Sequence, residues 1–252
     1  MVQSELLLKY KEINHYFFDR KDSTVFPNYQ SIINKCIFAE QVHGNKTVFI
    51  SNGKKFIPKA DGLMTDKLPQ YQSRLNRDGT GFRTIKQRSP VFQAGESSLF
   101  LGIRTADCLP IFFVDYEKQI IAAVHAGWKG LFSGIIESAL TQFRKRGSNV
   151  KNIVSVIGPH IGICCYNVPY DRVLEFKKRG INFDTAVVLR KSKWYLDLGR
   201  IAYLTIRNCG LFSKNIDMLS ICTYCDNRFF SYRREKSSPG RNYSVIGAAQ
   251  RN

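Results

Sequence analysis

Three short stretches of the chain each place a metal-binding type of side chain beside a turn. They are QVHGN around His43, TADCLP around Cys108 and VHAGW around His125. One thiolate and two imidazoles match a catalytic zinc site, in which three protein ligands leave the fourth position open for water or substrate. Zinc in such a site lowers the pKa of its water to about 7 and so supplies hydroxide at neutral pH.

The spacing of apolar residues indicates how two of these side chains could meet. Residues 109–114 and 120–125 are apolar strand candidates joined by the turn YEKQ. Antiparallel pairing would place Cys108 and His125 at the same end of neighbouring strands. Without a metal, the two could instead act as nucleophile and base. In a purely structural role, Cys108 would be a small core residue and His125 a satisfied histidine at a strand end.

The remaining pattern predicts a domain that mixes strands and helices. Apolar runs at 98–104, 110–115 and 120–126 are expected to form one central sheet. Apolar residues near a 3.6-residue period then predict a helix over 131–146 that ends at Gly147. Alternating strands and helices follow at 152–158, 170–178, 185–190, 198–208 and 244–249. A single α/β or α+β domain over residues 1–252 is the simplest organisation.

Composition bounds the class of protein. The 252 residues are 44% hydrophobic, enough for a full core, but the longest apolar runs are far shorter than a membrane span. The N-terminal residues resemble no signal peptide. The chain has seven cysteines, and this odd number favours reduced thiols over a set of disulfides. We therefore expect a cytoplasmic protein without a membrane partner. A stretch at about 67–98 is polar, basic and without periodicity, and is expected to be a mobile surface insertion.

The formal charge of +18 raises the question of nucleic acid as a partner. Basic residues are spread along the chain, however, and no helix-turn-helix, zinc-finger or RNP pattern accompanies them. A basic surface that suits a basic cytosol or an anionic substrate is the favoured interpretation. The nucleic-acid deaminase signature is also missing, because QVHGN has no Glu at the required place.

The other cysteines give a weaker metal signal. Cys222 and Cys225 form a CxxC, but a lone pair without a second pair at finger spacing favours a structural role over a second metal site. Adjacent Cys164 and Cys165 would face opposite ways in a strand, and we expect that they do not chelate together.

The motifs together closely resemble the YfiH family, also called the polyphenol oxidoreductase laccase or peptidoglycan-editing-factor family, whose members are purine nucleoside phosphorylases. The resemblance runs in the family's order over most of the chain, and TADCLP and HAGWKG are its most specific parts. The matching stretches are QVHG (41–44), ADG with LMTD (60–66), TADCLPIFFVD (105–115), AAVHAGWKG (122–130), IGPHIGICCYNV (157–168), DLGRIAYLTIRNCG (197–210), CTYCDNRFFSYRRE (222–235) and GRNYSVIGA (240–248).

The resemblance implies a layered α/β sandwich with a mixed central sheet. It also implies that His43, Cys108 and His125 bind one catalytic zinc ion, with copper as the alternative ion. The expected substrates are phosphate and purine nucleosides such as adenosine, inosine or methylthioadenosine, with deamination of adenosine as a further activity. Arg233 in SYRRE and Arg241 in GRNY are candidate substrate contacts for an anion, although exposed arginines are common without such a role.

The family's other names leave two alternative functions. One is a hydrolase that corrects misincorporated residues in peptidoglycan precursors. The other is a copper-dependent polyphenol oxidase, but a laccase needs many more imidazoles than the four histidines of this chain.

Overall fold

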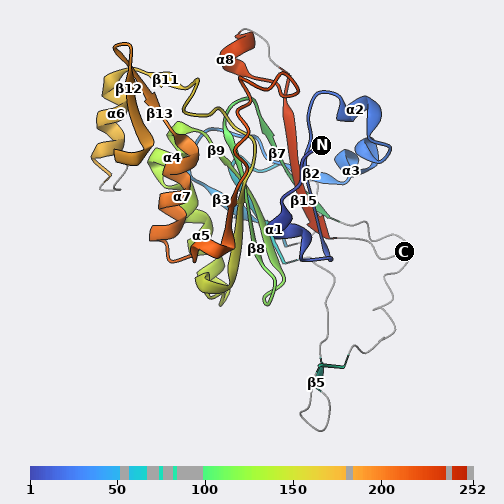
Figure 1. The fold of residues 1–252 in the computed structure, drawn as a ribbon. Coiled ribbons are helices and arrows are strands. Elements are labelled where there is room, and N and C mark those ends of the chain that lie inside the picture. Colours follow the sequence, from blue (N-terminus) through green and yellow to red (C-terminus); the bar gives the residue numbers. More distant parts are fainter. Residues whose placement is uncertain are drawn as a thin grey trace.

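The chain folds around two β-sheets that lie face to face, with helices on both outer sides (Figure 1). The computed structural model describes residues 1–51, 57–66, 74–75, 82–83, 99–179, 184–236 and 240–248. Both sheets contain parallel and antiparallel neighbours. The expected layered α/β fold with a mixed sheet is therefore confirmed.

A six-stranded sheet carries the hairpin that the sequence predicts. Its order is β14-β10-β8-β9-β4-β3, and β8 and β9 pair antiparallel at its centre. Its strands are β3 (Thr47–Phe49), β4 (Gly62–Thr65), β8 (Leu109–Asp115), β9 (Ile120–Ala126), β10 (Ile153–Ile157) and β14 (Ile216–Met218). Every residue of β8 and β9 is buried, because both faces of this sheet are covered, and this is why the two strands are continuous apolar runs.

The second sheet has four strands in the order β1-β15-β7-β2. They are β1 (Ile13–Phe17), β2 (Cys36–Phe38), β7 (Phe100–Thr105) and β15 (Asn242–Ala248). The expectation that β7 shares a sheet with β8 and β9 is wrong. Asp107, with a φ of 88°, lies in the short turn between β7 and β8, and this turn carries the chain from one sheet to the other.

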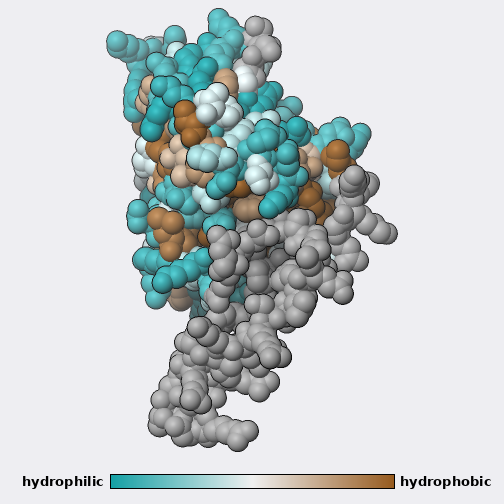
Figure 2. Space-filling view, turned by 90° about the vertical axis from the view of Figure 1, so that its right-hand side faces the viewer, coloured by the Kyte–Doolittle hydropathy of each residue, from teal (hydrophilic) through white to brown (hydrophobic). Residues whose placement is uncertain are grey.

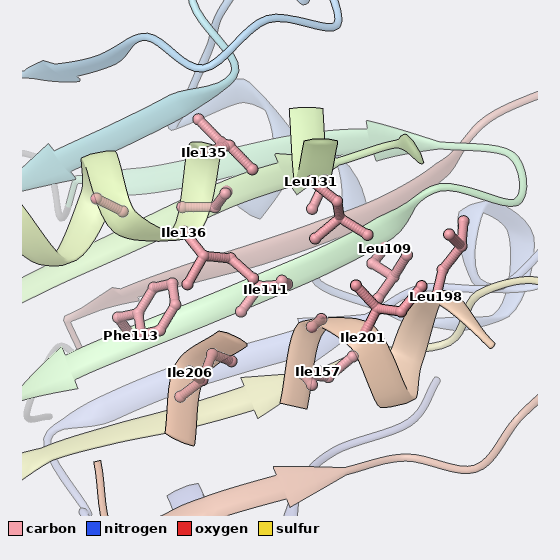
Figure 3. Packing of buried hydrophobic residues seen from close by; sticks show 14 of the residues in the cluster. Leu109, Ile111, Phe113, Leu131, Ile135, Ile136, Ile157, Leu198, Ile201 and Ile206 are labelled. Atoms are coloured by element: carbon pink, nitrogen blue, oxygen red, sulfur yellow. The ribbon is translucent and has the colours of Figure 1, made fainter. Parts of the chain in front are cut away.

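Side chains of β8 alternate between two hydrophobic clusters. Leu109, Ile111 and Phe113 pack against the helices, as Figure 3 shows. Phe112 and Val114 point to the opposite face and pack against the four-stranded sheet. This two-sided packing fixes the register of β8 and therefore the place of the residue that precedes it, because a slip by one residue would exchange the two faces.

Helices α4 (Trp128–Ser133), α5 (Ile135–Lys145) and α7 (Leu198–Asn208) cover the six-stranded sheet (Figure 3). The sequence predicts one helix over 131–146, but the structure has two. Gly134 separates them with a φ of +90°, a conformation that glycine adopts without steric cost. The helix predicted at 198–208 has the expected bounds, and the Asp197 side chain caps its N-terminus.

Smaller elements complete the described chain. The first 50 residues include three short helices that the hydrophobic pattern did not predict: α1 (Glu5–Leu8), α2 (Asp22–Val25) and α3 (Tyr29–Asn34). Beyond the main sheets lie α6 (Tyr170–Lys177), α8 (Tyr232–Glu235), the small sheet of β11 (Asn167–Val168), β12 (Val187–Arg190) and β13 (Lys193–Leu196), and the 3-10 turns η1 (Val150–Asn152), η2 (Asp184–Ala186) and η3 (Ser213–Asn215).

The basic stretch at 67–98 lies outside the described residues, apart from the backbone of two paired strands. These are β5 (Arg74–Leu75) and β6 (Phe82–Arg83).

Among the coloured residues on the face in Figure 2, most are hydrophilic, and the apolar ones form separate small groups. In the part of the chain that the structure describes, no helix has both the length and the apolar character needed to cross a membrane.

Candidate metal centre and active site

Three potential metal ligands lie together at one end of the β8–β9 hairpin. His43 is in the loop after β2, Cys108 directly precedes β8, and His125 is on β9. One imidazole nitrogen of each histidine and the cysteine Sγ all lie within 4.8 Å of one another. The two imidazole rings meet edge to face, with centroids 4.8 Å apart. The structure thus brings together the three residues that the sequence singles out, called the triad below.

Strand register explains why Cys108 meets His125. Pro110 is paired with His125 and Leu109 with Ala126, so Cys108 lies at the end of β9 that carries the histidine. The prediction that the two residues share one end of neighbouring strands is confirmed.

Asp61 joins His43 to this pair. Its carboxylate accepts a hydrogen bond from His125 Nδ1 at 2.8 Å and from the backbone amides of His43 at 3.0 Å and Gly44 at 2.7 Å. Its own carbonyl accepts from the His125 amide at 2.7 Å. The carboxylate is fully buried and immediately precedes β4, the other neighbour of β9. Asp61 therefore fixes the ring of one histidine and the backbone of the other, as carboxylates beside metal-binding histidines do.

Sequence reasoning assigned no role to Asp61. The sequence signal for Asp61 is its place in KADGLMT, where an acidic residue directly precedes a short apolar strand. A carboxylate at that place is buried as soon as the strand is, so it requires polar partners.

Two of the site's loops have an uncommon backbone conformation. His43 has a φ of 60° and Asp107 a φ of 88°. Positive φ is uncommon in residues other than glycine and is often found near functional sites. Asp107 is held by Thr223 Oγ1, which donates to it at 2.7 Å, and by the amide of Arg233 at 2.6 Å. These contacts fix the residue next to Cys108.

The triad favours a thiolate at neutral pH. Burial opposes ionisation of Cys108, but hydrogen bonds with His125 and His43 outweigh it and lower the thiol pKa to about 6. Burial also disfavours charged His125, yet its hydrogen bonds to Asp61 and Cys108 raise its pKa to about 9. In the absence of a metal, Cys108 and His125 therefore form a thiolate–imidazolium pair between these two pKa values.

The donor set fits one transition-metal ion. A soft thiolate and two imidazoles suit zinc or copper, and three protein ligands leave a position open. Gly127 leaves space beside the donors, since a Cβ there would lie 3.0 Å from Cys108 Sγ and 3.4 Å from His43 Cδ2. The residues of the triad could therefore hold such an ion.

A pocket of about 430 Å³ opens beside His43. Aromatic side chains and polar groups both line it: His43, Gly44, Asn45, Trp128, Lys129, Phe132, Ser133 and Glu175. Phe132 is 39% exposed although it is a large apolar residue. An aromatic wall with a few polar groups is typical of a small-molecule site.

Arg172, on α6, adds a positive charge near this pocket. Its guanidinium carbon lies 3.6 Å from the centroid of the Trp128 ring. Its Nε is buried and has no hydrogen-bond partner among the described residues. Burial raises the pKa of Tyr166, and a hydrogen bond with Arg172 opposes that rise. Sequence reasoning missed Arg172, because no motif distinguishes it from the many other basic residues.

The two arginines that the sequence proposed as anion contacts have different surroundings. Arg233 Nη1 donates to the Asn167 carbonyl at 3.1 Å, and its guanidinium carbon lies 5.3 Å from the centroid of the Tyr166 ring. Arg241 is exposed, and its Nη1 donates to the Gly240 carbonyl at 3.0 Å. Arg233 thus contacts the same tyrosine as Arg172, whereas Arg241 donates to the residue that precedes it in the chain.

The premise that Cys164 and Cys165 face opposite ways in a strand is wrong. Four cysteines, Cys164, Cys165, Cys222 and Cys225, have sulfur atoms within 4.8 Å of one another. Cys164 and Cys165 lie in a turn over residues 163–165 rather than in a strand, so the alternation of a strand does not separate their side chains. Cys222 and Cys225 therefore have the second pair of thiols that the sequence spacing did not reveal.

The chain is similar to known proteins of one family. The family model described as multi-copper polyphenol oxidoreductase laccase matches residues 92–249. A protein of Borreliella burgdorferi named purine nucleoside phosphorylase is 38% identical over 223 residues, which cover 84% of this chain and 91% of that protein. Adenosine deaminase RL5, from an unknown prokaryotic organism, is 32% identical over 151 residues, 59% of this chain and 58% of that protein.

A solved structure agrees with these relatives. The crystal structure of the Bacillus licheniformis protein YfiH has a TM-score of 0.71 and 27% identity, and the match covers 90% of this chain and 82% of the other. Since the family model covers more than half of the chain, and a relative matches nearly throughout, the chain belongs to the YfiH family.

Proposed function

We propose that this protein is a zinc-dependent purine nucleoside phosphorylase that also deaminates adenosine. In phosphorolysis, adenosine, inosine or methylthioadenosine reacts with phosphate to give the base and the ribose 1-phosphate. In deamination, adenosine reacts with water to give inosine and ammonia. The observation that carries the proposal is the His43, Cys108 and His125 donor set beside an aromatic pocket, in a chain whose relatives are named for these two activities.

The three triad residues would hold the zinc ion. Zinc there would act as a Lewis acid and ease the deprotonation of water at neutral pH. Asp61 accepts from His125 Nδ1 and so leaves Nε2 as the nitrogen for the metal. The lowered pKa of Cys108 supplies the thiolate that metal binding requires.

Residues of the pocket would position the nucleoside. Trp128 and Phe132 offer aromatic surface to a purine, and Asn45 and Glu175 offer polar groups to its edge or to the ribose. These residues adjoin His43, so a nucleoside bound there would lie next to the triad.

Arg172 is our main candidate for the phosphate. Its planar guanidinium can donate two parallel hydrogen bonds to an anion, and its buried Nε has no partner among the described residues. Arg233, which contacts the same tyrosine, is a second candidate, and Arg241 remains a proposal from the sequence alone.

The alternatives have less support. His15 accepts from the amide of Ser4, and His160 Nδ1 is hydrogen-bonded to the Gly158 carbonyl, so two of the four histidines are engaged by the fold. A multicopper oxidase needs more imidazoles than the two that remain. For a hydrolase of peptidoglycan precursors, none of the described residues that line the pocket specifically favours a larger substrate.

Replacement of a triad ligand tests the proposal. Cys108→Ala should lower kcat/KM for adenosine by about 10²- to 10³-fold in both reactions, the scale of losing transition-state charge stabilisation. Cys209→Ala, a half-buried cysteine outside the triad, should leave both rates unchanged. Arg172→Gln should keep the metal and the deamination rate but raise the KM for phosphate. Full turnover by a folded Cys108→Ala protein would contradict the proposed role.

A further inference from the structure

The four-cysteine cluster, Cys164, Cys165, Cys222 and Cys225, lies outside the triad and has no part in the proposed reaction. Its cysteines come from two turns that are far apart in sequence. The first turn follows β10, and the second follows β14, the strand that pairs with β10 in parallel. We propose that this cluster binds a second metal ion, a zinc held by four thiolates, which cross-links the two turns.

The distances suit one ion shared by four sulfurs. In a tetrahedral site with Zn–S bonds of about 2.3 Å, neighbouring sulfurs are about 3.8 Å apart. Cys225 Sγ lies 3.6 Å from Cys164 Sγ and 3.3 Å from Cys165 Sγ, and all four sulfurs are within 4.8 Å of one another. A cluster of several iron atoms would hold its cysteine sulfurs farther apart, because each sulfur binds a different iron.

The surrounding backbone is arranged for a negatively charged sulfur. The amide of Gly162 donates to Cys222 Sγ at 3.3 Å. Sulfur in a neutral thiol is a weak acceptor, so this bond is stronger when the sulfur is a metal-bound thiolate. A Cβ on Gly162 would lie 3.3 Å from Cys164 Sγ and 3.6 Å from Cys222 Sγ, so its absence leaves room for the cluster.

Two arginines bind the backbone around the cluster, and one of them, Arg234, is also paired with Glu235. One zinc ion with four thiolates carries a net charge of −2. Arg234 Nη1 donates to the carbonyls of Thr223 at 2.9 Å and Tyr224 at 2.7 Å, and Arg233 Nη1 donates to the Cys165 carbonyl at 3.5 Å. Both arginines thus bind the backbone of the turns that supply the cysteines.

The cross-link would be tied to the active site through Asp107. The amide of Thr223 donates to the His160 carbonyl at 3.0 Å, which joins the two turns, and Thr223 Oγ1 donates to Asp107 at 2.7 Å. Asp107 is next to Cys108 in sequence. The second zinc would therefore stiffen the loops that hold the Cys108 turn, without contact with substrate.

Metal content tests this proposal independently of activity. The protein purified under reducing conditions from zinc-supplemented cells should contain two zinc ions per chain, one for each donor cluster. Cys225→Ser and Cys108→Ala should each contain one, and Cys209→Ser, the matched control outside both clusters, should contain two. Cobalt(II) added to metal-free Cys108→Ala should give the intense near-ultraviolet and red absorption of four-thiolate cobalt.

Each other outcome has a defined meaning. One zinc per chain in the wild type, with all four thiols open to a thiol reagent in the native protein, would overturn the proposal. A disulfide among the four, detected by mass as the loss of two hydrogens, would overturn it as well, and so would iron in place of zinc. If Cys225→Ser does not fold, the cobalt spectrum of Cys108→Ala decides. If the wild type binds two zinc ions but does not turn over purine nucleosides, the proposed function is contradicted and this inference stands.

Discussion

Asp61 is the residue on which the geometry of the triad depends most. Its carboxylate accepts from His125 Nδ1 and from the amides of His43 and Gly44, and it is fully buried. Burial raises the Asp61 pKa, but the hydrogen bonds, above all that from His125, outweigh burial and lower it. The carboxylate therefore stays ionised opposite a histidine that a metal would use.

Replacement of Asp61 should weaken metal binding more than it disturbs the fold. Asp61→Asn places an amide NH2 where the carboxylate accepts hydrogen bonds, so the His125 ring loses its orientation. We expect the affinity of the triad for zinc to fall by about 10- to 100-fold, measured by competition with a chelator.

Asp115→Asn is the matched control for this variant. Asp115 is also a buried aspartate that accepts a backbone amide, from Lys118, but it lies at the opposite end of β8. The Asp115→Asn variant should have a lower free energy of unfolding than the wild type but the same zinc affinity. Equal zinc affinities in Asp61→Asn and the wild type would show that Asp61 is not a positioning residue.

At the residue scale, the sequence predicted the metal ligands better than the residues that surround and position them. His43, Cys108 and His125 have distinctive side chains in specific motifs, so they could be singled out. Asp61 and Arg172 are common residue types whose roles depend on burial and on partners distant in sequence. Such roles become visible only when the fold brings those partners together.

The helix α5 illustrates how elements hold the site in place. Its apolar side chains, Ile135, Ile136, Ala139, Leu140 and Phe143, are buried against the sheet that contains β8 and β9. The helix therefore stabilises the two strands that position Cys108 and His125.

Truncation of a buried side chain on α5 should cost stability but not metal affinity. Leu140→Ala is expected to lower the free energy of unfolding by about 2–5 kcal/mol, because the cavity lies in close-packed surroundings. Thr141→Ala, one residue farther along on the exposed side, should change it by less than about 0.5 kcal/mol. Urea unfolding measures both. A similar cost for the two variants would contradict the described burial of α5.

Element boundaries were predicted well where one periodicity dominates. β8, β9 and α7 match their expected ranges within a residue or two. The break at Gly134 and the transfer of β7 to the second sheet were missed. Both depend on single residues with positive φ, Gly134 and Asp107, which interrupt the chain's direction without changing the hydrophobic pattern.

On the scale of the whole molecule, one buried histidine links stability to pH. His15 is fully buried on β1, its Nε2 accepts from the Ser4 amide at 2.8 Å, and its Nδ1 has no hydrogen-bond partner among the described residues. Burial lowers its pKa to about 4, against a smaller raising effect of the Asp217 charge. The folded protein therefore keeps His15 neutral at a pH where the unfolded chain is protonated.

The sign of the effect follows from that difference. As the pH falls from about 6.5 to about 4, the unfolded state binds a proton that the folded state does not, so the fold loses stability. Between pH 7 and pH 5 the loss due to His15 should be about 2 kcal/mol. The His15→Gln side chain can still accept from the Ser4 amide. Measured by urea unfolding between pH 7 and pH 5, the free energy of unfolding of this variant should fall by about 2 kcal/mol less than that of the wild type. Parallel declines in the two proteins would contradict the assigned pKa.

Identification of the products formed from adenosine tests the central claim most directly. The zinc-loaded protein is incubated with adenosine, with and without phosphate, and the products are separated by chromatography. The proposed function predicts adenine and ribose 1-phosphate only when phosphate is present, and inosine in both cases, with part of the inosine converted to hypoxanthine when phosphate is present. Absence of all these products, while zinc is bound to the triad of a folded protein, would contradict it.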